Sequence, residues 1–320
     1  MDALRLLVKV SRPAGWCFGP ILYAIGAIHG NGSRAHTRAA KASTLILQLL
    51  SLSFPLALIV FGVNDVYDYT TDLLNPRKTA DGLEGTVLAP AHHPLVLTSA
   101  ALATLLILLL PLSLALPLSN VLTTLALLAL SWAYSAPPPR LKERPVLDSL
   151  SNGAIIVLAY LCGYTARGGA LGRGRGRGRT GVPTKGLVLG LCTAGVHALG
   201  AAVDVRADEA AGQRTIATAL GARGAAAFGA FCYVIALCAE RRLRSVFGVY
   251  LLGGLCALLL PLVDPAHAHL AFRAAVYWTV GMSAVWFADK ARSVAFPKQR
   301  GRDGESADTI SRSHGHDERR

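Results

Sequence analysis

The chain has 320 residues, of which 52% are hydrophobic and only 16% are charged, and its mean hydropathy is +0.44. Soluble domains carry about 25% charged residues, so the low charged fraction argues against a soluble enzyme. The composition as a whole excludes a disordered chain and a disulfide scaffold. The net charge of +13 is typical of basic flanks on membrane helices together with a basic tail. We therefore predict an all-α, multi-pass integral membrane protein.

Apolar segments long enough to cross a membrane follow one another along the chain. A bilayer core of about 30 Å requires about 20 apolar residues per helix. Nine segments approach this length, at residues 14–30, 43–63, 94–116, 118–134, 147–165, 185–203, 222–239, 245–263 and 271–289. The third and fourth are separated only by a few residues around Pro117, which predicts a tight helical hairpin. We expect a short N-terminal segment over 1–13, one nine-helix domain over 14–289 and a polar, disordered tail over 290–320.

Nine spans place alternate loops on opposite sides of the membrane. The loops around 64–93, 135–146 and 204–221 then share one side, and most of the acidic residues fall there in two compact clusters. The other side receives an Arg-Gly run at 172–181. Such a run could bind RNA, but in a membrane protein we interpret it as a low-complexity loop insertion. We expect no nucleic-acid partner.

The first acidic cluster runs from Asn64 to Asp72. On a helix, Asp65, Asp68 and Asp72 are i, i+3 and i+7, and Asn64 stands one turn before Asp68, so four oxygen-bearing side chains are predicted to face much the same direction. No Lys or Arg lies within the cluster, and carboxylates beside a membrane are costly unless a cation neutralises them. Mg²⁺, which prefers oxygen ligands, is the natural partner.

The second acidic cluster places Asp204 and Asp208 at i and i+4, again at the end of an apolar segment. A single acidic loop beside a membrane is usually only solvated. Two matched clusters on one side would clamp a polyanion such as a diphosphate through bound metal ions. A proton or cation relay in a transporter is the competing interpretation. The acids flank the spans instead of lying at mid-span, which argues against it.

A proline-rich, basic loop lies between the two clusters. Its three consecutive prolines prevent a helix and predict an extended backbone. Arg140, Lys142 and Arg144 alternate in this loop, so an extended chain would project all three to one side, where they suit phosphate oxygens. Arg77, just after the first cluster, and Arg12, at the foot of the first span, would add further cations.

Three segments resemble signatures of the UbiA superfamily of intramembrane prenyltransferases. They are N-D-x-x-D-x-x-x-D from Asn64 to Asp72, D-x-x-x-D-x-x-x-G-x-x-T from Asp204 to Thr215, and Y-S-A-P-P-P-R-L-K from Tyr134 to Lys142. Their order and the nine spans fit this family over roughly residues 10–290. The resemblance implies a nine-helix bundle with a central cavity. It further implies that Mg²⁺ joins both Asp motifs to a polyprenyl diphosphate, whose tail enters through a lipid-side opening.

The resemblance also implies roles for individual residues. The implied metal ligands are Asn64, Asp68, Asp204 and Asp208, with Asp65 and Asp72 supporting the site or meeting the metal through water. The implied catalytic residues are Asp68, Asp204 and Tyr134. The implied diphosphate-binding residues are Lys142, Arg77, Arg12 and Ser135. Tyr134 and Ser135 would line the cavity near the reacting carbon.

Two local features point to a subgroup within the superfamily. Many members carry an Asp or Asn where this chain has Ala201, which leaves the second motif one potential ligand poorer. The Asn-Pro-Arg-Lys segment at 75–78, with Gly-Leu-Glu-Gly at 82–85, is most similar to members related to the lycopene elongases of carotenoid biosynthesis.

These observations predict an Mg²⁺-dependent prenyltransferase. It would move a polyprenyl group from its diphosphate to a hydrophobic acceptor through an allylic carbocation, in contact with membrane lipid. A membrane terpene cyclase, in which the substrate's own double bond captures the cation, uses the same ionising residues and stays an alternative. A transporter or a lipid-binding protein that keeps the fold without catalysis is the third hypothesis.

Overall fold

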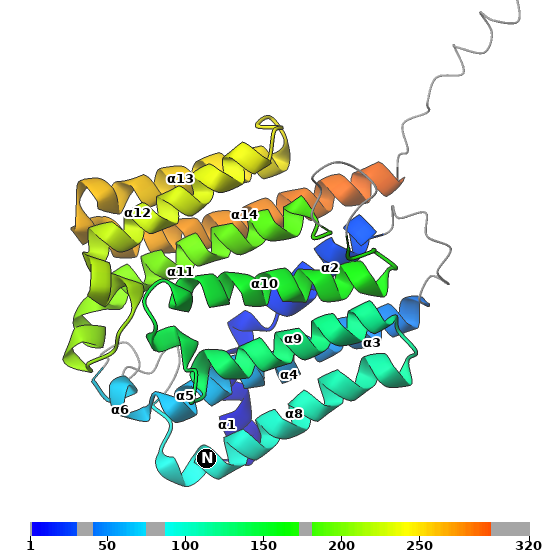
Figure 1. Ribbon diagram of the computed structural model, residues 1–320, viewed down its shortest axis with the longest axis horizontal. Helices are drawn as coiled ribbons and strands as arrows, with labels where there is room; N and C mark the ends of the chain where they lie inside the picture. The colour runs from blue at the N-terminus through cyan, green and yellow to red at the C-terminus, as the bar shows by residue number, and fades with distance from the viewer. Residues whose placement is uncertain (1, 31–40, 75–86, 173–180, 296–320) are drawn as a thin grey trace, which may run out of the picture.

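The computed structural model describes residues 2–30, 41–74, 87–172 and 181–295, and within these ranges it contains helices and turns but no strand (Figure 1). Eight of the helical segments in this part of the chain are long and apolar enough to cross a membrane. The prediction of an all-α, multi-pass membrane protein is therefore confirmed. Of the Arg-Gly run predicted at 172–181, residues 173–180 lie outside the described residues, as do residues 296–320 of the predicted tail. The prediction that the tail begins at residue 290 is wrong, because the last helix continues to Ala295.

The first half of the bundle contains the helices up to α10. Their bounds are α1 Ala3–Val10, α2 Phe18–Gly30, α3 Ala42–Ser51, α4 Phe54–Ala57, α5 Val63–Tyr67, α6 Tyr69–Asp72, α8 His93–Ser113, α9 Leu118–Ser135 and α10 Leu147–Ala166. A π-helical turn, Leu58–Gly62, joins α4 to α5. The hairpin predicted around Pro117 is present, because α8 ends at Ser113 and α9 begins at Leu118.

The second half contains four long helices. They are α11 Thr184–Ala210, α12 Ile216–Ala239, α13 Val246–Val263 and α14 Ala268–Ala295. Hydroxyl caps fix two of their starting points: Thr215 and Thr218 form a capping box at α12, and Ser245 accepts a hydrogen bond from the Gly248 N–H at α13. α11 runs seven residues beyond the predicted span at 185–203, so the second acidic motif belongs to its last turns.

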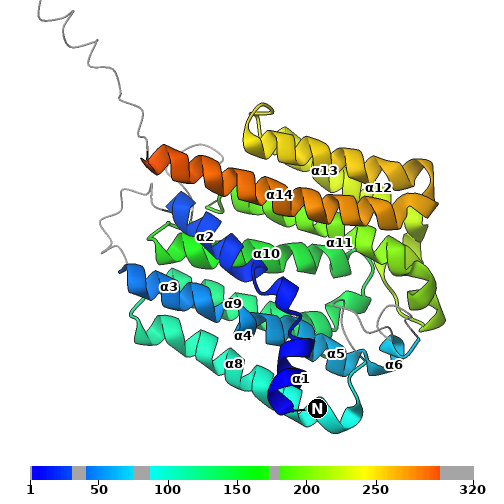
Figure 2. The ribbon, with the colours of Figure 1, turned by 180° about the vertical axis from the view of Figure 1, so that it is seen from behind.

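The helix within the segment predicted as the first span, 14–30, is shorter than expected. This helix, α2, has 13 residues and lies outside the eight spans counted above. The chain turns sharply before it, because Arg12 adopts a left-handed backbone conformation with φ of 51° and Pro13 opens a 3₁₀ turn. Helix α1 therefore runs across the direction of the other helices instead of continuing into α2 (Figure 2).

Helix α10 holds the two halves together, since it packs against α2, α9 and α11. Glycines allow α10 and α2 to approach each other closely. A Cβ atom at Gly163 would lie 1.9 Å from the Tyr23 carbonyl oxygen, and one at Gly26 would lie 1.9 Å from the Tyr160 carbonyl oxygen. Such small residues are typical of helix contacts within membranes, where close packing replaces the hydrophobic effect as the main attraction.

Exposed leucines cover the outer face of the bundle. Helix α8 presents a row of them at helical spacing: Leu102, Leu105, Leu106, Leu109 and Leu112. A soluble protein rarely exposes an apolar surface of this extent, whereas lipid tails are a favourable partner for it.

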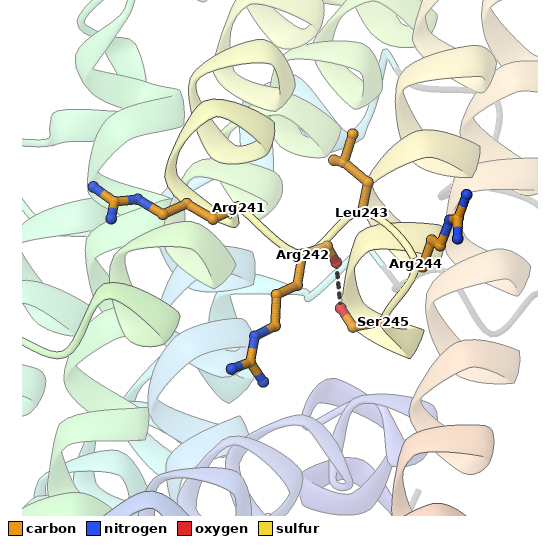
Figure 3. Close-up of a pocket in the computed structure, with 5 residues that line it drawn as sticks. All are labelled: Arg241, Arg242, Leu243, Arg244 and Ser245. Atoms are coloured by element: carbon orange, nitrogen blue, oxygen red, sulfur yellow. Dashed lines mark hydrogen bonds between the residues drawn. The ribbon is translucent and has the colours of Figure 1, made fainter.

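The loops divide between the two ends of the bundle, as alternating spans predict. Helices α5 and α6, carrying the first acidic motif, lie at the end where α11 leads into α12 (Figure 1). The loop between α12 and α13 lies at the opposite end and carries exposed Arg241, Arg242 and Arg244. There the Ser245 hydroxyl donates to the Arg242 carbonyl at 2.7 Å (Figure 3).

Candidate active site

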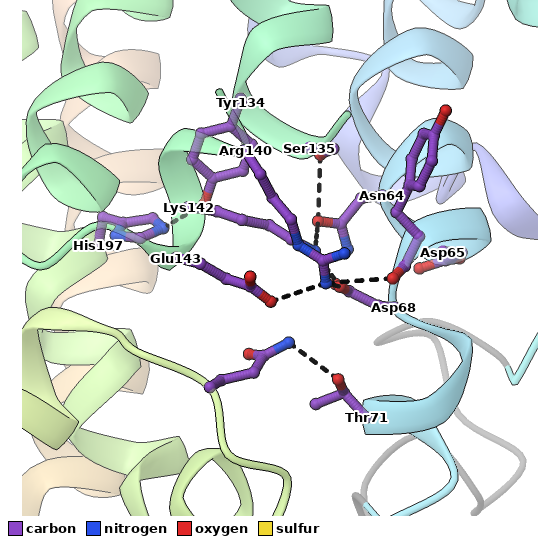
Figure 4. A network of polar contacts seen from close by, with 12 residues as sticks. Asn64, Asp65, Asp68, Thr71, Tyr134, Ser135, Arg140, Lys142, Glu143 and His197 are labelled. Carbon is purple, nitrogen blue, oxygen red and sulfur yellow. Dashed lines mark hydrogen bonds and ion pairs between the residues drawn. The ribbon is translucent and has the colours of Figure 1, made fainter. Parts of the chain in front are cut away.

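Two oxygen atoms of the first motif converge on one ammonium group (Figure 4). The Lys142 Nζ donates to Asn64 Oδ1 at 3.1 Å and also contacts Asp68 Oδ1. Ser135, at the end of α9, donates from its hydroxyl to the same Asn64 oxygen at 3.3 Å. Lys142 and Asp68 are each only 7% exposed. The structure thus brings together four residues that the sequence implied for the site: Asn64, Asp68, Ser135 and Lys142.

A second cation reaches Asp68 from the same loop. Arg140 Nη2 lies 3.3 Å from Asp68 Oδ1 and 2.7 Å from Glu143 Oε1, and it donates to the Tyr67 carbonyl at 3.2 Å. Sequence reasoning placed Arg140 in the basic loop but did not select it as a site residue. Since Asp68 accepts from two cations, its negative charge is balanced by the chain itself.

The extended conformation predicted for this loop is wrong. Residues Leu141–Glu143 form a 3₁₀ turn, and Arg140 before it adopts φ of 40°. The turn sends Lys142 inward to Asp68, while Arg144 is exposed and donates to the Pro139 carbonyl at 2.9 Å. Only two of the three alternating cations therefore meet the acidic motif.

Asp65 does not share the direction of its neighbours, which corrects the prediction of one four-membered face. Its Oδ1 accepts from Arg12 Nη2 at 2.8 Å, and the residue is completely buried. The helix is interrupted between Asp65 and Asp68, because Asp68 ends α5 with φ of −99° and ψ of 5°, so the i, i+3 spacing does not place the two on one continuous helix face. Arg12, implied as a diphosphate ligand, therefore pairs with Asp65, and its guanidinium lies 4.8 Å from the Phe61 ring centroid.

The second motif lies on the last turns of α11. Asp208, 9% exposed, accepts a hydrogen bond from the Thr215 hydroxyl at 3.3 Å. Asp204 is one turn earlier and partly exposed. The loop that follows reaches the first motif directly, since Gln213 Nε2 donates to Thr71 Oγ1 at 3.0 Å (Figure 4). This contact places the two acidic segments at the same end of the bundle.

A histidine that sequence reasoning did not select adjoins this site. His197 Nε2 lies 2.7 Å from the Tyr134 hydroxyl, and its Nδ1 lies 3.2 Å from the Ser149 hydroxyl. The sequence does contain a signal for it. His197 precedes Asp204 by seven residues and Asp208 by eleven, so on a helix all three occupy one face.

Two further residues implied by the resemblance are Arg77 and Asp72. Arg77 lies outside the described residues, as do the Asn-Pro-Arg-Lys and Gly-Leu-Glu-Gly segments. Asp72 ends helix α6 and is 3% exposed.

A model of the UbiA prenyltransferase family matches residues 19–288. The chain belongs to the UbiA prenyltransferase family. As a member with eight apolar spans among its described residues, it is an integral, multi-pass membrane prenyltransferase.

Curated relatives and a solved structure agree with this family membership. The chain is 33% identical over 255 residues to a lycopene elongase/hydratase of Haloarcula japonica, covering 78% of each chain. It is 31% identical over 242 residues to a lycopene elongase/hydratase of Corynebacterium glutamicum, covering 74% of this chain and 76% of the relative. A UbiA homolog from Archaeoglobus fulgidus bound to GPP and Mg²⁺ has the same fold, with a TM-score of 0.60, 19% identity and coverage of 91% and 99%.

The donor set at the first motif fits an oxygen-preferring cation. Asn64 and Asp68 already direct oxygen atoms at the positive charge of Lys142, and amide and carboxylate oxygens are the ligands that Mg²⁺ accepts. Within the described ranges, no three His, Cys, Asp or Glu side chains gather closely enough to hold a metal by themselves.

Proposed function

We propose that this UbiA family member transfers a prenyl group from a prenyl diphosphate to a hydrocarbon acceptor of the carotenoid class, with Mg²⁺ as the cofactor. The convergence of Asn64, Asp68 and Lys142 carries the proposal, because it joins oxygen ligands for a divalent cation to an ammonium donor for phosphate. The relatives named lycopene elongase/hydratase support a carotenoid acceptor. The solved homolog with GPP and Mg²⁺ supports the donor and the metal.

Each group at the site has a task in this reaction. A bound Mg²⁺ would neutralise the charge that develops on the departing diphosphate. Asn64 and Asp68 would hold it on the first motif, and Asp204 and Asp208 on the second. Lys142 would turn its ammonium group from Asp68 toward the diphosphate oxygens, a movement that its long, flexible side chain permits. Arg140 would add a second phosphate contact beside it.

The test is diphosphate release by the purified protein in liposomes. Dimethylallyl, geranyl, farnesyl and geranylgeranyl diphosphates are supplied with and without lycopene, and with Mg²⁺ or a chelator. We expect release that needs lycopene, Mg²⁺ and Asp68, with a prenylated carotenoid as product. Asp68→Asn should lower the rate about 10²- to 10³-fold, the scale of losing one transition-state electrostatic group.

Two other outcomes would contradict the proposal in different ways. Release without lycopene, accompanied by a cyclic hydrocarbon or terpene alcohol, would identify a terpene cyclase. Release that is the same in the Asp68→Asn variant would show that the first motif is not the ionising site.

A further inference from the structure

The His197 imidazole lies between two hydroxyl groups from neighbouring helices. Tyr134 on α9 approaches Nε2 at 2.7 Å, and Ser149 on α10 approaches Nδ1 at 3.2 Å. Figure 4 shows the Tyr134 hydroxyl directed at the His197 ring. If the Tyr134 hydroxyl donates to Nε2, the ring proton is on Nδ1 and points to Ser149. In this tautomer the neutral imidazole can accept the phenolic proton of Tyr134 at Nε2 when the Tyr134 oxygen receives a proton from another group.

This pair lies next to the proposed ionising site but deeper in the bundle. Tyr134 adjoins Ser135, which contacts Asn64. His197 shares one face of α11 with Asp204 and Asp208, and seven residues of helix place it about 10 Å below Asp204. Diphosphate bound between the acidic motifs would leave its hydrocarbon end on this deeper side. The hydroxyl of Tyr134 would then lie nearer to the carbon atoms of the donor than to its phosphate oxygens.

The proposed reaction must release a proton there, so this inference depends on the proposed function. The C–O bond of the donor breaks and its electron pair leaves with the diphosphate. The π electrons of the acceptor's double bond then form the new C–C bond, and the neighbouring acceptor carbon becomes a cation. A hydrocarbon acceptor has no acidic O–H or N–H group. The cation is neutralised when an adjacent C–H bond gives its electron pair to a new double bond and its proton to a base, or when water adds to the cation and then loses a proton.

We propose that Tyr134 and His197 together take up this proton. The Tyr134 oxygen accepts it from carbon while the phenolic proton moves to His197 Nε2, which leaves a neutral tyrosine and an imidazolium. In this scheme Tyr134 is the catalytic residue and His197 acts through it. The imidazolium later returns the proton to water.

A buried carboxylate lies where it stabilises that imidazolium. Asp148 is completely buried and adjoins Ser149, whose hydroxyl lies 3.2 Å from His197 Nδ1. Its two oxygens accept from the Ser149 N–H at 2.7 Å and from the Ile216 N–H at 2.8 Å. Both N–H groups belong to the first turns of helices, where negative charge is favoured. A negative charge on Asp148 would attract a positive charge on His197.

The ratio of two products separates this role from a structural one. A cation that is not deprotonated is captured by water, so the alkene product gives way to an alcohol heavier by one water molecule. We would measure both by mass spectrometry, with diphosphate release and melting temperature, in wild type, His197→Gln and Tyr134→Phe. Glutamine keeps a hydrogen-bond acceptor for Tyr134 but takes up no proton. The matched control is His29→Gln, because His29 Nδ1 lies 2.9 Å from the Tyr160 hydroxyl in a similar pair on other helices.

We expect the alkene-to-alcohol ratio to fall at least about tenfold in His197→Gln and Tyr134→Phe, since a positioned general base contributes about 10²- to 10⁴-fold. His29→Gln should keep the wild-type ratio. Unchanged ratios in both site variants, with diphosphate release intact, would overturn the inference alone, as would a wild-type enzyme that makes only alcohol. If His197→Gln does not fold, Tyr134→Phe decides. No diphosphate release by the wild type with lycopene would instead overturn the proposed function, and the inference with it.

Discussion

Lys142 contacts Asp68 across 74 residues of sequence, and its ammonium group lies where two oxygens of the first motif meet. The ammonium therefore occupies the position that the donor set offers to a divalent cation. Its positive charge neutralises a nearly buried carboxylate, and in the proposed reaction it would contact a phosphate group once Asp68 holds the metal.

The first prediction concerns competition between Lys142 and Mg²⁺. Lys142→Met should lower the free energy of unfolding in chelator by about 1–3 kcal/mol, because Asp68 loses its ammonium contact and keeps the longer one to Arg140. Added Mg²⁺ should restore more stability to this variant than it gives the wild type, since no ammonium competes for Asp68. Melting temperatures measured with Mg²⁺ and with chelator provide the test.

The control for this measurement is Lys185→Met. Lys185 contacts Glu240 in a similar ion pair on α11 and α12, away from the acidic motifs. Its loss should leave the Mg²⁺-dependent change in melting temperature at the wild-type value. Equal Mg²⁺ responses in the two variants would contradict a metal site at Asp68.

The second prediction assigns Arg12 a structural task. Asp65 is completely buried and bonded to Arg12 at 2.8 Å, so Arg12→Leu should cost about 3–5 kcal/mol by leaving a buried charge without this contact. Replacing both residues with Leu should recover most of that loss, because the charge is removed with its partner. A double-mutant cycle on the free energy of unfolding measures the coupling. Additive losses, together with a donor KM that rises in Arg12→Leu, would instead favour a diphosphate contact.

The third prediction tests the link between the two motifs. Gln213→Ala removes the 3.0 Å hydrogen bond to Thr71, which is worth about 0.5–1.5 kcal/mol. We expect the KM for the prenyl diphosphate to rise about 2- to 10-fold, since the second motif loses a contact that positions it opposite the first. Thr71→Val should have the same effect, and combining the two changes should add little. If the fold-change in KM of the double variant equals the product of the two single fold-changes, the two residues act independently and not through their hydrogen bond.

The fourth prediction concerns the α2–α10 contact. Gly163→Val should prevent stable assembly or lower the melting temperature strongly, because its side chain would overlap the Tyr23 carbonyl; overpacking alone costs about 1–3 kcal/mol. The control is Gly281→Val in α14, where an added Cβ meets no atom within 4 Å. Thermal unfolding in detergent compares them. Similar melting temperatures in the two variants would show that the helices separate easily at this contact.

The class of protein can be predicted from the sequence alone, and so can the segments that carry the proposed site. Long apolar segments need no tertiary information to be read as membrane helices, because the thickness of the bilayer sets their length. The spacing of Asn64 and Asp68, and of Asp204 and Asp208, likewise indicates shared helix faces. The exception among the spans is residues 14–30, where the turn at Arg12 and Pro13 shortened the helix.

Which side chains contact one another depends on the tertiary structure. Asp65 and Asp68 contact different cations, Arg12 and Lys142, which arrive from segments 53 and 74 residues away. The 3₁₀ turn at Leu141–Glu143 directs Lys142 inward and Arg144 outward. The alternation of the cations in the sequence did not predict this, because it assumes an extended backbone. His197 on α11 contacts Tyr134 on α9 because α10 packs against both of these helices. The sequence does not show that the two helices lie close together.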